Sequence, residues 1–299
     1  MNTTPKIDLM IVGAQKAGTT SLNNYLNEHP EIIGHATLQK EFAYFRDNNI
    51  FSNGYEKAFQ SAFTIPSGND NRKKIVAKNA AIYNNETAIK HLYEHNPEGK
   101  VIFILREPVS RTYSSYAMEV FKGWMDRDFV EIKSVVGNNN MEDDMYKFFI
   151  EPSLYIHHID IIFKYFTNNQ VKLFLFEDFK TNPGIICKEI FEWLEVDANF
   201  SPTIQKTHNE TKKAKSKIVS KLIYNLKQES NLIKKIAKKV LPYSIFSRLG
   251  ETIVESNKST QSAEKISEDM SLLLQKYFKP YNEELAIKTK LPIDKFWKY

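Results

Sequence analysis

The feature that most constrains the fold is a short apolar run that ends in a glycine loop and continues into a helical pattern. The run, residues 7–12, is too short for a helix and stops at Gly13, so we expect a buried strand. Leu22 and Leu26 lie on one face of a predicted helix over residues 20–27. The loop between the predicted strand and the predicted helix therefore presents backbone N–H groups at a helix N-terminus, where the macrodipole favours an anion.

The loop, residues 13–21, reads Gly-Ala-Gln-Lys-Ala-Gly-Thr-Thr-Ser. Gly13 and Gly18 permit tight turns and a close approach of the backbone to a phosphate. Their spacing fits the P-loop pattern, but Thr19 stands where that pattern requires lysine. The lysine lies earlier, at Lys16, where it suits a group attached to a single 5′-phosphate better than a triphosphate. The alternative is an ordinary strand-to-helix turn that contains two glycines.

Further short apolar runs alternate with helical patterns along the chain. The predicted strands are residues 31–34, 74–77, 101–105 and 171–176, and the predicted later helices include residues 86–95 and 183–194. Such alternation is typical of a parallel α/β sheet covered by helices on both faces. We expect a single domain over residues 1–299, with a basic helical segment at about 212–260.

A second candidate anion site follows the predicted strand 101–105. A Walker-type metal site would place aspartate at such a strand end, whereas this chain has Arg106, followed by Glu107 and Pro108. A cation there argues against a magnesium–triphosphate enzyme. The Arg106 guanidinium can hold a phosphate with two hydrogen bonds, and Ser114 can add a hydroxyl from the helix that follows. A structural Arg–Glu pair is the alternative.

Composition and charge limit the cellular compartment and the kinds of ligand that we expect. Cys187 is the only cysteine, which excludes an intrachain disulfide and makes a cytoplasmic setting plausible. There is no apolar stretch of about 20 residues, and residues 1–8 lack the pattern of a secretory signal. A net charge of +5 suits an anionic ligand without selecting a nucleotide, nucleic acid or acidic glycan. No His, Cys and Asp cluster has metal-ligand spacing, so no metal is expected.

The glycine loop and the Arg106 segment together resemble the 5′-phosphosulfate and 3′-phosphate motifs of the sulfotransferases that use 3′-phosphoadenosine-5′-phosphosulfate (PAPS). Within that family, the chain resembles the heparan-sulfate sulfotransferase type and its bacterial relatives. Residues 40–45 resemble the Lys-Glu-x-x-Phe-Phe segment of that family, residues 78–83 its Lys-(Ser/Thr)-Pro-x-Tyr segment, and residues 153–158 its Tyr-x-x-His helix. Asn79 and Ala80 depart from the family by replacing its hydroxyl–proline pair.

The resemblance implies a P-loop-like central parallel sheet flanked by helices on both faces. It also implies PAPS as the cofactor, with adenosine 3′,5′-bisphosphate as the product. The implied cofactor contacts are Lys16, Ala17, Gly18, Thr19, Thr20 and Ser21 at the 5′-phosphosulfate and Arg106 and Ser114 at the 3′-phosphate. A late basic loop of the family falls at residues 212–217, where Lys215 and Ser216 are the expected contacts.

The implied reaction moves a sulfuryl group to a hydroxyl or amine of a carbohydrate or small-molecule acceptor. Such transfer depends on positioning and on stabilising charge at the oxygens. We expect Lys16 to stabilise the departing oxygen, Glu41 to act as the general base and Lys78 to orient the acceptor or the sulfuryl group. For Glu41 the alternative is a solvated surface carboxylate beside Lys40.

Three competing functions stay open at this point. They are a P-loop nucleotide phosphotransferase, a non-catalytic nucleotide-binding protein and a nucleic-acid binder that uses the basic segment. The third is disfavoured, because the aromatic residues of that segment form no recognisable stacking motif. Residues 212–239 have three interpretations: a solvated helix face, a lid over the cofactor or an acidic acceptor, and a helix in peripheral contact with a membrane.

Overall fold

The computed structural model describes residues 4–37, 40–65, 73–204, 212–214, 258–262 and 266–297. The chain divides into two compact units. The first unit comprises Met1–Glu107, Leu154–Thr207 and Lys279–Lys298. The second unit is formed mainly by Pro108–Ser153 and His208–Phe278.

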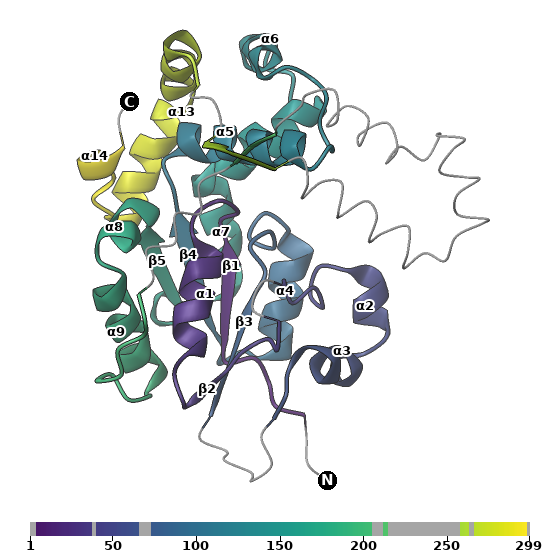
Figure 1. Cartoon of the computed structure of the whole chain (residues 1–299), viewed down its shortest axis with the longest axis vertical. Helices are drawn as coiled ribbons and strands as arrows, with labels where there is room; N and C mark the ends of the chain where they lie inside the picture. Colours follow the sequence, from purple (N-terminus) through teal and green to yellow (C-terminus); the bar gives the residue numbers. More distant parts are fainter. Residues whose placement is uncertain are drawn as a thin grey trace, which may run out of the picture. The chain divides into compact units, whose positions relative to one another are not determined.

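The first unit is built on a five-stranded parallel sheet in the order β2-β3-β1-β4-β5 (Figure 1). Its strands are β1 (Leu9–Gly13), β2 (Ile32–Ile33), β3 (Lys74–Lys78), β4 (Lys100–Leu105) and β5 (Val171–Leu175). All four strand pairings are parallel, so the carboxyl ends of the strands meet at one edge of the sheet. The predicted α/β class is confirmed, although Phe176 begins a helix instead of closing β5.

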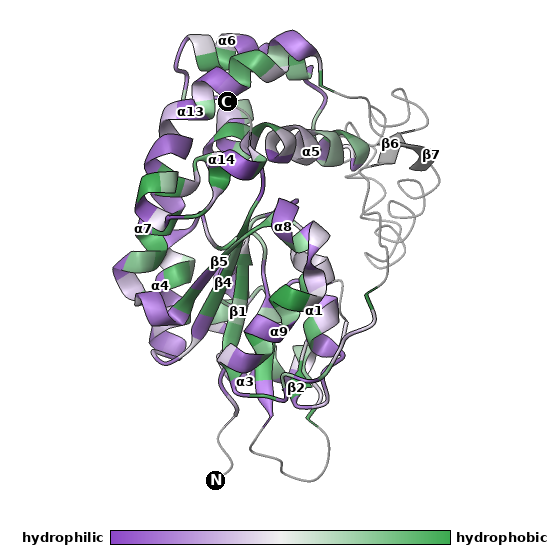
Figure 2. Ribbon diagram, turned by 90° about the vertical axis from the view of Figure 1, so that its left-hand side faces the viewer, coloured by the Kyte–Doolittle hydropathy of each residue, from purple (hydrophilic) through white to green (hydrophobic). Residues whose placement is uncertain are grey.

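Helices cover both faces of this sheet. The longer ones are α1 (Thr19–Asn27), α4 (Glu86–His95), α7 (Tyr155–Tyr165) and α9 (Pro183–Leu194). Helices α1 and α9 pack together on one face, and α4 and α7 on the other (Figures 1 and 2). Every residue of β1 is buried, as expected for a central strand covered on both sides. Shorter helices complete the unit: α2 (Asn48–Ser52), α3 (Tyr55–Ala62), α8 (Phe176–Thr181) and α14 (Ile293–Phe296).

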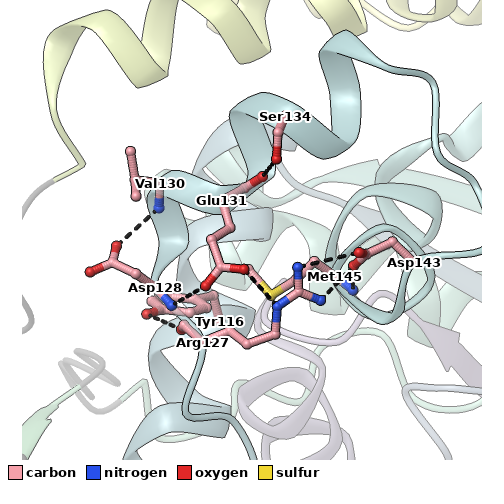
Figure 3. Close-up of polar contacts among 8 residues, drawn as sticks. All are labelled: Tyr116, Arg127, Asp128, Val130, Glu131, Ser134, Asp143 and Met145. Atoms are coloured by element: carbon pink, nitrogen blue, oxygen red, sulfur yellow. Dashed lines mark hydrogen bonds and ion pairs between the residues drawn. The ribbon is translucent and has the colours of Figure 1, made fainter.

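The second unit contains α5 (Pro108–Phe121), α6 (Ile132–Gly137), the helical turns Phe129–Glu131, Tyr146–Ile150 and Glu151–Ser153, and the start of α13 (Glu268–Thr289). Arg127 holds two of its segments together (Figure 3). Its guanidinium bonds the Glu131 carboxylate at 2.9 Å and both oxygens of Asp143 at 2.7 and 3.2 Å. Inside the unit, the buried Arg111 donates to Phe149 O and Ser153 Oγ.

The basic segment that was expected to be helical, at about 212–260, has strands instead of helix in the two parts that the structure describes. Strands β6 (Lys212–Ala214) and β7 (Lys258–Ser262) pair in antiparallel fashion. The β7 sequence Lys-Ser-Thr-Gln-Ser has no apolar residue that could form the buried face of a helix. As a strand, it pairs its backbone N–H and C=O groups with those of β6. Among the described residues, no helix combines the length and apolar character needed to cross a bilayer.

Candidate functional site

The glycine loop joins β1 to α1 in the first unit. A Cβ at Gly13 would lie 2.3 Å from Cδ1 of the buried Tyr83, so only glycine fits there. Lys16 and Gly18 both adopt positive φ, at 74° and 81°. Gly18 precedes the first residue of α1 and provides no side-chain cap. The loop thus ends at the N-terminus of α1, an end of a helix at which backbone N–H groups lack intrahelical acceptors and the macrodipole favours an anion.

Lys78 links Glu41 to this loop. Its Nζ donates to Glu41 Oε1 at 2.9 Å and to Thr20 Oγ1 at 3.2 Å. The other carboxylate oxygen of Glu41 accepts the backbone N–H of Ala80 at 2.8 Å. The side chain of Lys78 is 1% exposed and that of Glu41 is 42% exposed. Glu41 is thus a fixed carboxylate at the edge of the loop rather than a freely solvated one, and it balances a buried ammonium charge.

Backbone pairing explains why Glu41 reaches this place. Lys78 closes β3, in register with Ile11 of β1. The carbonyl of Lys78 accepts the N–H of Phe42 at 2.8 Å, and Asn79 Nδ2 donates to Phe42 O at 3.1 Å. Phe42 is itself buried. These contacts dock the Lys-Glu segment onto the strand end and direct the Glu41 carboxylate toward Lys78.

His35 lies in the electrostatic surroundings of this pair, although sequence reasoning did not single it out. Burial lowers the pKa of the His35 imidazole, and the positive charges of Lys40 and Lys78 lower this pKa further, while Glu41 opposes them. Its Nδ1 accepts the N–H of Thr37 at 3.0 Å. The imidazole is therefore favoured in the neutral form, and it adds no cation to the site near neutral pH.

Arg106 reaches the glycine loop from the end of β4. Its Nη1 donates to the carbonyl of Lys16 at 2.8 Å, and its guanidinium lies 5.0 Å from the centre of the Phe176 ring. The Tyr155 hydroxyl donates to Arg106 O at 2.9 Å and accepts from Arg106 N at 3.3 Å. The two segments predicted to bind the two ends of one nucleotide are thus in direct contact.

Glu177 is a further residue at this sheet edge, which the sequence reasoning missed. It is the second residue after β5 and accepts hydrogen bonds from the backbone N–H of Glu107 and from the indole of Trp297, each at 3.1 Å. One sequence signal was available, because Glu177 follows the predicted strand 171–176, and an acidic residue after a strand of a parallel sheet lies at the same edge as Arg106.

The other predicted cofactor residues have different outcomes. Ala17 and Thr19 are buried, and Thr20 and Ser21 are half-buried in the first turn of α1; their contacts with a 5′-phosphosulfate stay a prediction. Ser114 is buried in α5 of the second unit, and its role at the 3′-phosphate stays a prediction. Lys215 and Ser216 lie outside the described residues.

Two other reactive side chains of the first unit belong to its core. Burial raises the pKa of the Cys187 thiol to about 12, which keeps it protonated and unreactive at neutral pH. His158 is 1% exposed, and its ring packs edge-on against that of Tyr83 with the ring centres 5.1 Å apart. Within the described ranges, no group of three or more His, Cys, Asp or Glu side chains is arranged to hold a metal ion.

The fold and this site place the chain in the P-loop-like α/β class, with a glycine loop between the first strand and first helix. Residues 6–241 match the family model described as Sulfotransferase domain, and the chain belongs to this family. A sulfotransferase from Alicyclobacillus acidocaldarius shares the fold, with a TM-score of 0.54 and 19% identity, over 85% of this chain and 96% of that one.

Two curated relatives illustrate the sequence similarity. Membrane-associated sulfotransferase kil1 of Dictyostelium discoideum is 32% identical over 124 residues, which are 40% of this chain and 24% of the relative. Bifunctional heparan sulfate N-deacetylase/N-sulfotransferase 3 of Mus musculus is 27% identical over 198 residues, which are 64% of this chain and 22% of the relative. The chain thus matches about a quarter of the length of these relatives or less.

Proposed function

We propose that this protein transfers the sulfuryl group of PAPS to a hydroxyl or amine of a carbohydrate or small-molecule acceptor. The observation that carries the proposal is the position of Lys78, whose Nζ bonds both Glu41 Oε1 and Thr20 Oγ1. This ammonium group connects a carboxylate suited to proton removal with a loop suited to a 5′-phosphosulfate. Membership of the sulfotransferase family supports the same reaction.

The residues of the first unit fit the charge pattern of PAPS. The glycine loop leads into the N-terminus of α1, where the helix dipole favours an anion, and Lys16, Thr19, Thr20 and Ser21 supply a cation and hydroxyl groups. Arg106 supplies a planar guanidinium for the 3′-phosphate. A magnesium–triphosphate site would instead place an acidic ligand at the end of β4. We therefore assign the 5′-phosphosulfate to the loop and the 3′-phosphate to Arg106.

PAPS would supply a sulfuryl group activated by its bond to a phosphate oxygen, with adenosine 3′,5′-bisphosphate as the leaving group. Glu41 would accept the acceptor proton at its carboxylate, which Lys78 and the Ala80 N–H hold in one orientation. Lys16 would stabilise negative charge at the departing oxygen. Lys78 would also orient the acceptor or the sulfuryl group through its positive charge.

The proposal also covers the class of acceptor and the location of the protein in the cell. The name of the mouse relative specifies heparan sulfate, which favours a carbohydrate among the acceptors to be tried first. A cytoplasmic setting agrees with the single, buried cysteine. The name of the Dictyostelium relative specifies membrane association, so peripheral contact with a membrane is a second setting to test.

The test is a screen of carbohydrate and small-molecule acceptors with ³⁵S-labelled PAPS, alongside calorimetry with adenosine 3′,5′-bisphosphate and with magnesium–ATP. We expect label in an acceptor product and tighter binding of the bisphosphate. Binding of magnesium–ATP alone would replace the proposal with a phosphotransferase. Binding of the bisphosphate without transfer to any acceptor class would favour a non-catalytic nucleotide-binding protein.

A further inference from the structure

We propose that Glu177 is a positioning residue for Arg106 and thereby sets the preference of the site for a 3′-phosphorylated adenine nucleotide. The inference rests on the proposed function, because it assumes that Arg106 binds the 3′-phosphate. Glu177 does not itself touch the nucleotide in this account. It acts on the main chain beside Arg106.

The peptide unit between Arg106 and Glu107 is held at both of its polar atoms. Its N–H, from Glu107, donates to Glu177 Oε1 at 3.1 Å, and its carbonyl, from Arg106, accepts the Tyr155 hydroxyl at 2.9 Å. A peptide unit is planar, so two fixed bonds on opposite sides determine its orientation. The direction in which the Arg106 side chain leaves the strand end follows from that orientation.

The residue before Glu177 positions the same arginine through its side chain. The Phe176 ring lies 5.0 Å from the guanidinium, and a Cβ at Gly18 would be only 3.0 Å from Phe176 Cε2. The ring thus contacts both the loop and the arginine, while Arg106 Nη1 bonds the loop carbonyl of Lys16. Phe176 and Glu177, which follow β5, together fix the side chain and the main chain of Arg106.

Trp297 holds Glu177 in turn. Its indole Nε1 donates to Glu177 Oε2 at 3.1 Å, and its ring lies 6.0 Å from that of Tyr155. Trp297 is 3% exposed, and Ile293 of the preceding helix α14 is fully buried. The carboxylate therefore has a separate donor for each oxygen, and the residue that orients Glu177 also packs against the tyrosine that holds the Arg106 carbonyl.

Because Glu177 is negatively charged, the direction in which its removal changes nucleotide affinity tests the inference. A carboxylate close to an anion site repels the anion, so its removal should tighten binding if charge were its only effect. Loss of the positioning contacts should instead weaken binding, and only for a ligand that needs Arg106. The two effects predict opposite changes in the affinity for a 3′-phosphate.

The experiment is calorimetry of the full chain with two probes, adenosine 3′,5′-bisphosphate and adenosine 5′-monophosphate. We compare Glu177→Ala with Asp178→Ala, which removes the same charge one residue later in α8, from a carboxylate bonded to Asn182 Nδ2. We expect the wild type to prefer the bisphosphate. Glu177→Ala should lose about ten-fold in affinity for the bisphosphate, the size of one weakened hydrogen bond to a charged group, and keep its affinity for the monophosphate. Asp178→Ala should keep the wild-type ratio.

The outcomes separate this inference from the proposed function. A wild type without preference for the bisphosphate overturns the assignment of the cofactor and the inference with it. A wild type with that preference, and a Glu177→Ala variant that retains or increases it, overturns the inference alone. An equal loss for both probes indicates a general structural role and also overturns it. If circular dichroism shows that Glu177→Ala is unfolded, Glu177→Gln replaces it, because the amide offers only one acceptor to the two donors and should reduce the ratio in the same direction.

Discussion

Nη1 of Arg106 donates a hydrogen bond to the carbonyl of Lys16 at 2.8 Å and thereby joins two segments that lie 90 residues apart in the chain. One segment is the glycine loop after β1, and the other is the end of β4. The parallel order of the sheet makes this contact possible, because β1 and β4 are neighbours and their carboxyl ends lie at one edge.

Arg106→Ala should weaken binding of adenosine 3′,5′-bisphosphate by about 1.5–3 kcal/mol, the value of a hydrogen bond to a charged group. Arg106→Lys should recover only part of this loss, since a lysine lacks the planar fork of donors. Calorimetry measures both. Unchanged affinity in Arg106→Ala would remove Arg106 from the binding site.

Glu41→Gln should lower turnover by about 10²–10⁴-fold, the usual contribution of general-base assistance. Affinity for the bisphosphate should stay within about two-fold, because the amide keeps an acceptor for the Ala80 N–H. The matched control is Glu56→Gln in α3, whose carboxylate accepts from Gln60 Nε2 on the surface. Wild-type turnover in the Glu41 variant would end the assignment of this base.

Lys78→Met should separate stability from activity. The buried ammonium group is costly to dehydrate, and methionine has a similar shape, so the free energy of unfolding should change by less than about 1 kcal/mol. The 42% exposed side chain of Glu41 can be rehydrated when its partner is lost. Turnover should nevertheless fall by at least about ten-fold, since a positive charge at the reacting groups disappears.

Urea unfolding and labelled-PAPS turnover check the two effects of Lys78→Met. The control is Lys90→Met in α4, which removes an exposed ion pair with Glu94. A large loss of stability with normal activity of the folded fraction would show that Lys78 serves the fold alone.

Much of the site could be predicted because its parts are local in sequence. The strand, loop and helix from β1 to α1 follow from one apolar run, two glycines and one amphipathic pattern, and the structure has each of them. The resemblance to sulfotransferases placed Glu41 and Lys78 among the candidates. It could not show that one ammonium group bonds both Glu41 and Thr20, because that depends on the register of β3 against β1.

The sequence could place Glu177 at the sheet edge but could not predict its contacts, and it could not predict the strands of the basic segment. A carboxylate next to an anion site is unfavourable by charge alone, so Glu177 has meaning only with its donors Glu107 and Trp297 in place. Strand β6 pairs with β7, in which Lys258 lies opposite Ala214 and 44 residues after it, and a pairing that distant leaves no local pattern in Lys212–Ala214.

Gly13→Ala should destabilise the first unit by about 1–3 kcal/mol, since its Cβ would lie 2.3 Å from the Tyr83 ring and the core would have to shift. Gly137→Ala is the matched control, because a Cβ there meets no atom within 4 Å. That control should be neutral or slightly stabilising. Thermal unfolding compares the two variants, and equal melting temperatures would refute the close packing at Gly13.

Stability should decrease in acid through His95. Its Nε2 accepts the Ile7 N–H at 3.1 Å, and burial lowers the pKa of His95 to about 4. The folded pKa thus lies below the unfolded value of about 6.5. The contribution of His95 is complete above pH 6.5 and is lost as pH falls from 6.5 toward 4.

His95→Gln keeps an acceptor for the Ile7 N–H without titrating. Urea unfolding at pH 7 and pH 5 should show a smaller loss of stability in this variant than in the wild type. The pKa of Asp8 is raised, chiefly by burial, and acts in the opposite direction in both proteins, so it largely cancels in the comparison. Identical pH dependence of the two proteins would contradict the role of His95.

A crystal structure with adenosine 3′,5′-bisphosphate bound tests the central claim most directly. We predict the 5′-phosphate against the backbone N–H groups at the start of α1, next to Lys16, and the 3′-phosphate against the Arg106 guanidinium. A nucleotide bound at another place, or bound with its 3′-phosphate away from Arg106, would contradict the account.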